Sequence, residues 1–94
     1  MNRQAQQKQQ TEAKKTMDIA NLIRMANRIG EFFQAMPDRD EAIAGVANHI
    51  RKFWEPRMRR ELLEHVAQAG SAELHPLVAE AIARQREALM PAAG

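Results

Sequence analysis

The stretch Phe53-Trp54-Glu55-Pro56-Arg57-Met58-Arg59-Arg60 decides how this chain folds, because it separates one helical pattern from the next. A proline disfavours helical backbone in the residue before it, so Pro56 predicts that the preceding helix ends near Trp54. Proline also suits the first position of a helix, where its missing N–H is no loss. The stretch therefore predicts a bend between two helices, with an aromatic pair before it and three arginines after it.

These three arginines, Arg57, Arg59 and Arg60, are placed unfavourably for the helix that they begin. The amino end of a helix carries partial positive charge, and a cation there costs about 0.3–1 kcal/mol at low salt. One interpretation is that the arginines and the aromatic pair, Phe53 and Trp54, project from a rigid corner toward an anionic partner. The alternative is a solvated basic surface around a tryptophan that belongs to the domain's own core.

Residues 18–36 are predicted to form the first helix, with an apolar face of unusual width. One row at helical spacing comprises Ile19, Leu22, Ile23, Ala26, Ile29, Gly30 and Phe33. A second row, offset beside the first, comprises Met25, Ile29, Phe32 and Met36. Together the rows cover roughly half of the circumference, more than the ~100° stripe of a surface helix. The excess favours a second buried face, unless this helix is simply the central one of its own bundle.

Three further helices are predicted. Asp38 as a capping residue, with Glu41 three positions later, starts a helix that runs to about residue 54 and turns either Phe53 or Trp54 inward. Residues 56–69 follow and end at Gly70, and residues 71–89 form a weaker last helix with Pro76 near its first turn. No segment has the period-two alternation of a strand. The predicted fold class is therefore all-α, a small three- to four-helix domain.

Residues 1–16 differ from the rest of the chain and are predicted to be a disordered polar arm. They are rich in glutamine, and alanine is their only apolar type after Met1. The helical domain is expected to cover residues 17–90. Residues 1–17 carry a net charge of +3, whereas the remainder has ten basic and eleven acidic side chains. The basic charge belongs to the arm, which weakens the case for a nucleic-acid-binding domain.

The residue types for most kinds of catalysis are missing. The chain has no cysteine, which excludes disulfides and thiolate-bound metals or clusters on it. Its histidines, His49, His65 and His75, do not have metal-ligand spacing, and no glycine-rich phosphate loop occurs. No apolar run approaches the length of a membrane span. We expect no catalytic, cofactor-binding or metal-binding residues, and a chain that is not an enzyme by itself.

Two long blocks of sequence resemble a known family. The blocks are MDIANLIRMANRIGEFF at residues 17–33 and IAGVANHIRKFWEPRMRR at residues 43–60. Both are similar to the delta subunit of bacterial NAD-dependent formate dehydrogenase. The similarity covers about residues 17–70, with a looser trailing helix, and the residues before Met17 lie outside the family pattern.

The resemblance implies membership of a cytoplasmic complex that oxidises formate to CO₂ and passes the electrons to NAD⁺. The alpha subunit of such complexes holds a molybdenum or tungsten bis-molybdopterin guanine dinucleotide and iron–sulfur clusters. Beta and gamma subunits hold FMN, the NAD site and further clusters. The delta subunit itself carries no cofactor, and the resemblance implies that it supports assembly or stability of the complex.

The predicted surface for a partner combines the corner with the offset row of the first helix. Its residues are Met25, Phe32, Met36, Phe53, Trp54, Arg57, Arg59 and Arg60. The corner is expected to be the main docking site for the alpha subunit. Two alternatives stay open: a transient chaperone for cofactor insertion, and a small helical nucleic-acid-binding protein that uses Arg51, Lys52, Arg57, Arg59 and Arg60. Neither a membrane nor a nucleic acid is an expected partner.

Overall fold

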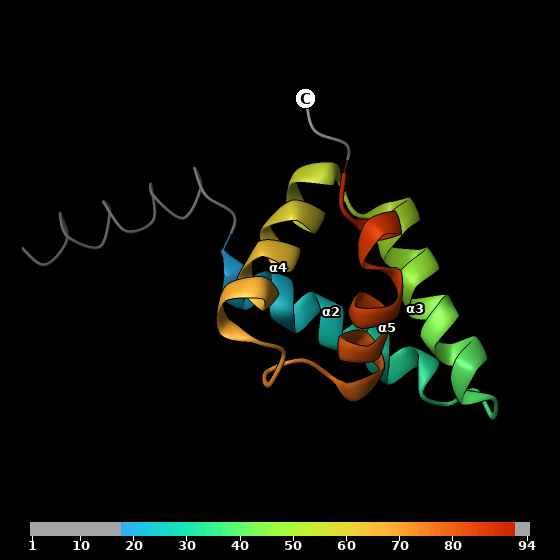
Figure 1. Cartoon of the computed structure of the whole chain (residues 1–94). Helices are drawn as coiled ribbons and strands as arrows, with labels where there is room; N and C mark the ends of the chain where they lie inside the picture. The colour runs from blue at the N-terminus through green and yellow to red at the C-terminus, as the bar shows by residue number, and fades with distance from the viewer. Residues whose placement is uncertain (1–17, 92–94) are drawn as a thin grey trace, which may run out of the picture.

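The computed structural model describes residues 18–91, which form four helices and contain no strand (Figure 1). The helices are α2 (Ile19–Phe33), α3 (Arg39–Phe53), α4 (Pro56–Ala69) and α5 (Pro76–Leu89). The all-α fold class is confirmed. The predicted polar arm, residues 1–16, lies outside the described residues. No helix within residues 18–91 has the length and apolar character needed to cross a bilayer.

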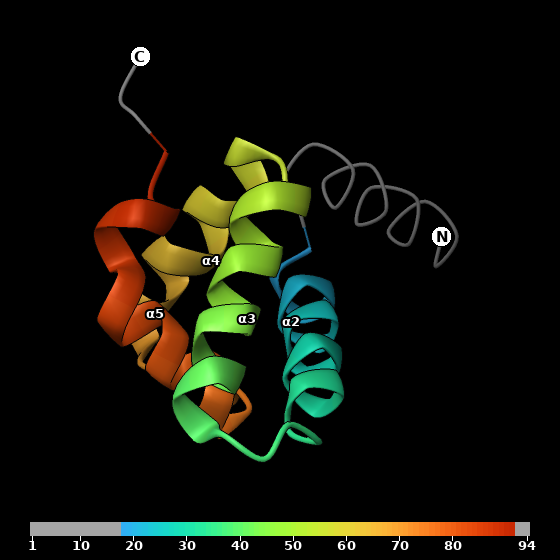
Figure 2. The same ribbon diagram turned by 90° about the vertical axis from the view of Figure 1, so that its right-hand side faces the viewer.

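The helices pack so that α2 touches each of the other three, while α3 and α5 form the most extensive pair. In Figure 2, α3 lies in front between α5 and α2, with α4 behind. The first apolar row of α2 supplies this packing, since Leu22, Ala26 and Gly30 are buried. The first row is therefore buried within the domain's own bundle, as expected for a central helix.

One core draws on all four helices. Its largest fully buried side chains are Leu22, Ile43, Val46, Ile50, Leu62, Leu63, Val78 and Leu89. Among the described residues, no polar or charged side chain is fully buried. A core made of aliphatic side chains on amphipathic helices is what the sequence pattern predicts.

The helix ends follow the predicted signals at three positions. The Asp38 carboxylate accepts hydrogen bonds from the backbone N–H groups of Asp40 and Glu41, at 2.9 and 3.3 Å, and so caps α3. Pro56 occupies the first turn of α4. Gly70 ends α4 with a φ of 86°, a conformation that favours glycine.

Two predicted boundaries are wrong, and a proline lies close to each. The first helix ends at Phe33 and not at Met36. Met36 precedes Pro37, a position that disfavours helical backbone. The last helix begins at Pro76 and not at Ser71. His75, the residue before Pro76, has φ −53° and ψ 140°, so no helix can continue through it.

The link between α4 and α5 is held against α2 by side-chain hydrogen bonds. Asn27 donates its amide to the carbonyl of Glu73 at 3.0 Å, and its amide oxygen accepts from the His75 N–H at 2.8 Å. The His75 ring caps α5 through the Leu77 N–H, at 3.1 Å, and lies 2.9 Å from the Gln34 side-chain oxygen. These contacts fix the start of α5 relative to α2.

An arginine bridges α3 and α5 at the protein surface. Arg84 lies 3.0 Å from a carboxylate oxygen of Asp40 and 3.1 Å from one of Glu80. The hydrogen bond with Asp40 first, and that with Glu80 second, raise the pKa of Arg84 above its ordinary value. An exposed bridge of this kind contributes little to stability, but it joins the start of α3 to α5.

Candidate docking surface

The tryptophan of the predicted corner lies in the core. Trp54 is 5% exposed and belongs to the same hydrophobic cluster as the buried residues of all four helices. The expectation that Trp54 projects from the corner is therefore wrong in this structure. An indole carries a large apolar area, and its burial stabilises the fold more than a partly exposed position would. Phe53, the other candidate for the inward position, is 71% exposed.

The three arginines of the basic corner, residues 55–60, have different surroundings. Arg57 is exposed, whereas Arg59 and Arg60 are half-buried. Arg59 donates from Nη1 to the carbonyl of Leu89 at 3.3 Å, and its buried Nε has no hydrogen-bond partner among residues 18–91. A cation at the carboxyl end of a helix interacts favourably with the exposed carbonyls. Arg59 thus joins the start of α4 to the end of α5, and Arg57 is the arginine that faces solvent.

A row of aromatic rings on α2 and α3 forms a second surface feature, which we call the aromatic strip (Phe32, Phe33, His49 and Phe53). Consecutive ring centroids are 5.1, 6.3 and 4.8 Å apart along this order. Phe32 is 75% exposed, and Phe33 and His49 are half-buried. The strip therefore has an exposed phenylalanine at each end and partly buried rings between them.

A glycine on α3 makes the strip possible. A Cβ atom built on Gly45 would lie 2.5 Å from Cε1 of Phe33, a separation that no stable contact allows. Because Gly45 has no side chain, the Phe33 ring lies directly against the backbone of α3. The close approach brings the rings of the two helices into one row.

A hollow of about 270 Å³ opens on the strip. It is lined by Arg28, Ile29, Phe32, Phe33 and His49. Arg28 is the one arginine in this lining, and no carboxylate is part of it. The hollow can therefore accept an apolar group with a negative charge beside it.

The two methionines of the predicted surface lie apart from this hollow. Met25 is half-buried against the core, and its sulfur accepts a hydrogen bond from the Asn21 amide at 3.6 Å. Met36 is 36% exposed and lines a different hollow, beside Pro37 and His75. The structure places Phe32 and Phe53 in one row but does not bring Met25 or Met36 into it.

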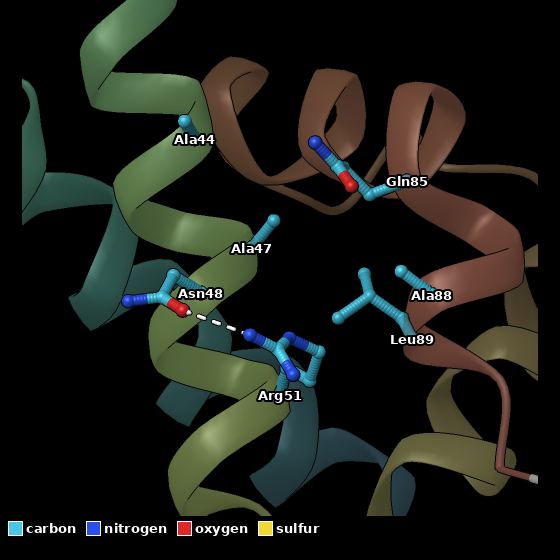
Figure 3. Close-up of a pocket in the computed structure, with 7 residues that line it drawn as sticks. All are labelled: Ala44, Ala47, Asn48, Arg51, Gln85, Ala88 and Leu89. Atoms are coloured by element: carbon cyan, nitrogen blue, oxygen red, sulfur yellow. Dashed lines mark hydrogen bonds between the residues drawn. The ribbon is translucent and has the colours of Figure 1, made fainter.

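A groove of about 190 Å³ lies between α3 and α5 (Figure 3). Its α3 side carries Ala44, Ala47, Asn48 and Arg51, and its α5 side carries Gln85, Ala88 and Leu89. The Arg51 guanidinium donates to the Asn48 side-chain oxygen at 3.4 Å. Gln85 has φ −118° and ψ 25°, so α5 is kinked here. The groove is lined by small apolar side chains, two amides and one guanidinium that donates to Asn48.

Within the described part of the chain, no three metal-ligating side chains come together. The histidines have separate local contacts: His49 lies in the strip, His75 caps α5, and His65 lies 3.3 Å from a Glu73 carboxylate oxygen. The most exposed large apolar side chains of the described residues, Phe32 and Phe53, belong to the aromatic strip, with Arg28 beside its hollow.

A family model described as "NADH-dependant formate dehydrogenase delta subunit FdsD" matches residues 21–82. The chain belongs to this family. The resemblance stated from the sequence is therefore confirmed. The match begins in α2 and ends within α5, so it includes both the aromatic strip and the basic corner of this delta-subunit domain. Comparison with curated proteins and with solved structures gave no match.

Sequence reasoning found the ends of the strip but missed its middle. The helical pattern places Phe33 on the core row and does not single out Arg28 or His49. The signal that could have found His49 is its spacing from Phe53, since residues four apart lie on one helix face. The contact of Phe33 with α3 depends on Gly45 and on how two helices pack, and no pattern within one helix contains that information.

Proposed function

We propose that this delta-subunit chain is a non-catalytic accessory subunit of a cytoplasmic NAD-dependent formate dehydrogenase complex. It docks on the catalytic alpha subunit and supports assembly or stability of the complex, in which beta and gamma subunits are further partners. The molybdenum or tungsten cofactor, the iron–sulfur clusters and FMN would reside on those subunits. The family membership supports the assignment of this chain to such a complex, and the exposed aromatic strip supports the docking role.

The single observation that carries the docking role is the exposure of Phe32 and Phe53. Every other phenylalanine or tryptophan of the described residues is buried or half-buried. Burying one such side chain is worth about 1.5–3 kcal/mol. Two exposed rings in one row, bordered by charged side chains, are typical of a protein–protein contact.

The nucleic-acid-binding alternative receives less support from the arrangement of the arginines. Arg51 is hydrogen-bonded to Asn48 in the α3–α5 groove, and Arg59 is hydrogen-bonded to the carbonyl of Leu89. Phosphate binding requires basic side chains that gather on one surface and stay available. Arg51, Lys52 and Arg57 are exposed, and Arg59 and Arg60 are half-buried. Three exposed cations, in a sequence after residue 17 that has more acidic than basic side chains, make a weak electrostatic site.

The test is a purification from the native host with an affinity tag on this chain. We expect the formate-oxidising subunit to co-purify through moderate salt, and deletion of the gene to lower the yield of assembled complex. Residual complex from the deletion strain should keep its normal turnover per bound molybdenum or tungsten. A chain that purifies alone, or that is retained on DNA with a steep salt dependence, contradicts the proposal.

The same purification separates a permanent subunit from an assembly chaperone. A permanent subunit is present in constant ratio to the catalytic subunit in fully active complex. A chaperone for cofactor insertion is enriched on the catalytic subunit that lacks its molybdenum or tungsten cofactor, and it is lost from the active complex.

A further inference from the structure

We infer that the aromatic strip receives an amphipathic helix of the partner subunit, whose apolar face meets the rings and whose edges carry carboxylates. The inference rests on the proposed function, because it specifies the chemistry of the surface that meets this chain. It follows from three features of the strip: the spacing of its rings, the sign of the charges beside it, and the poor fit of other occupants.

The ring spacing matches the repeat of a helix. The centroids lie 4.8–6.3 Å apart, and one turn of an α-helix rises about 5.4 Å. A helix that presents one apolar side chain per turn can therefore contact successive rings along the strip. Same-face side chains of a strand are about 6.6–6.8 Å apart, and they would lose register along it. Binding of an amphipathic helix in an apolar groove is a common mode of peptide recognition.

The lining of the hollow on the strip contains an arginine and no carboxylate. Arg28 lines the hollow between Phe32 and His49. Lys52 is exposed and lies three residues after His49, at a spacing that places both on one side of α3. Glu31, next to Phe32, is the nearest acidic residue in the α2 sequence. Cations on both helices favour a partner helix with aspartate or glutamate along its edges.

The chain's own arm fits this surface poorly. Residues 1–17 contain no aliphatic or aromatic side chain larger than alanine except methionine, and their net charge is +3. Such a segment offers no apolar residue at each turn, and its charge has the same sign as Arg28 and Lys52.

A second copy of the chain fits poorly as well. A two-fold interface uses the same patch on both subunits. Strip-to-strip pairing would bring two copies of Arg28 and two of Lys52 to one seam, where like charges repel. The occupant that satisfies both the rings and the cations is therefore a different chain.

The first experiment replaces the exposed rings in the tagged chain with Phe32→Glu/Phe53→Glu. We expect unchanged helicity and unchanged thermal unfolding of the free chain, since both rings are in solvent. Binding to the formate-oxidising subunit should weaken at least about ten-fold, because truncated aromatic anchors dominate interface energetics. The matched control is Ala67→Glu/Ala83→Glu, which adds the same charges at exposed positions of α4 and α5 and should bind normally.

The outcomes separate this inference from the proposed function. If the wild-type chain co-purifies with the formate-oxidising subunit and the phenylalanine variant does so equally well, the docking helix is elsewhere and only the inference fails. If the wild-type chain binds none of the subunits, the proposed function and the inference fail together. If the free wild-type chain is a dimer that the variant converts to a monomer, while subunit binding is unchanged, the strip is a self-interface and the inference is overturned.

The second experiment identifies the occupant directly. A photo-reactive benzoylphenylalanine at position 32 or 53 is cross-linked within the assembled complex, with position 83 as the control. Mass spectrometry of the cross-linked peptide should give a segment of another subunit with apolar residues three and four apart and flanking carboxylates. A cross-link to a second copy of this chain, or to a segment without that pattern, contradicts the inference.

Discussion

Phe53 and Trp54 are neighbours in sequence, but one lies at the surface and the other in the core. Phe53 completes the exposed aromatic strip, whereas Trp54 is buried in the hydrophobic core. Both are aromatic, and both precede the same proline. Residue type therefore identifies candidates for an interface, but the position around the helix decides which of them a partner can reach. The basic corner combines exposed residues, such as Arg57, with half-buried ones, such as Arg59, whereas the strip exposes two phenylalanine rings.

The largest expected difference is between Trp54→Ala and Phe53→Ala. Loss of the buried indole should lower the free energy of unfolding by about 3–5 kcal/mol, which is most of the stability of a domain of this size. Loss of the exposed phenyl ring should change it by less than about 0.5 kcal/mol. Urea unfolding followed by far-UV circular dichroism measures both values. Trp54→Phe keeps much of the buried area and should recover part of the lost stability. Equal effects of the two alanine variants would contradict the assignment of Trp54 to the core and Phe53 to the surface.

Gly30→Ala and Gly45→Ala compare two close contacts of a glycine, one with a side chain that is fixed and one with a side chain that can move. A Cβ at Gly30 would lie 2.7 Å from Cγ of His75, whose ring and backbone are held by hydrogen bonds. We expect a net loss of about 1–2 kcal/mol, since overpacking exceeds the gain in helix propensity. At Gly45 the obstacle is the Phe33 ring, which can move outward into solvent, so stability should change by less than about 1 kcal/mol. Thermal unfolding tests the order, and a larger loss at Gly45 would show that the strip is rigid.

Arg59→Ala and Arg57→Ala divide the corner into its internal and external parts. Arg59→Ala removes the hydrogen bond to the Leu89 carbonyl and should cost about 1 kcal/mol of stability. Arg57→Ala replaces an exposed side chain, and its effect should stay within about 0.5 kcal/mol. Chemical unfolding of the two variants under identical conditions provides the comparison. Equal losses would mean that the carbonyl contact contributes nothing.

The smallest expected effect concerns charge at the corner. Arg57→Glu/Arg60→Glu should leave the helicity of the free chain normal and should weaken partner binding about two- to five-fold at low salt, mainly through slower association. The effect should shrink as salt is added, because exposed charges are screened. Surface plasmon resonance with the purified catalytic subunit measures both rates. If this variant loses more binding affinity than Phe32→Glu/Phe53→Glu, the basic corner is the main docking site.

Local rules predicted most of the helix ends. Asp38, Pro56 and Gly70 act as the capping, starting and stopping residues that their types indicate. The start of α5 follows the same rule as the start of α4, because His75 before Pro76 leaves the helical region just as Glu55 does before Pro56. Met36 before Pro37 likewise lies outside the helix.

The candidate surface was predicted less completely, because it depends on two helices at once. The width of the apolar face on the first helix correctly indicated that Phe32 lies off the core row. Nothing in the sequence of either helix states that Phe33 lies beside Gly45, or that Phe53 rather than Trp54 faces outward. These facts follow from the relative rotation of α2 and α3, which the packing of the core determines.

The two hydrogen bonds of Asn27 have a consequence for engineering the chain. One side chain on α2 holds a carbonyl and an N–H of the link at residues 70–75, on either side of Leu74. An inserted fluorescent protein or a circularly permuted terminus between Glu73 and His75 would separate these two residues, so the Asn27 amide could no longer hold both. Reporters for studying assembly of the complex are therefore better fused elsewhere.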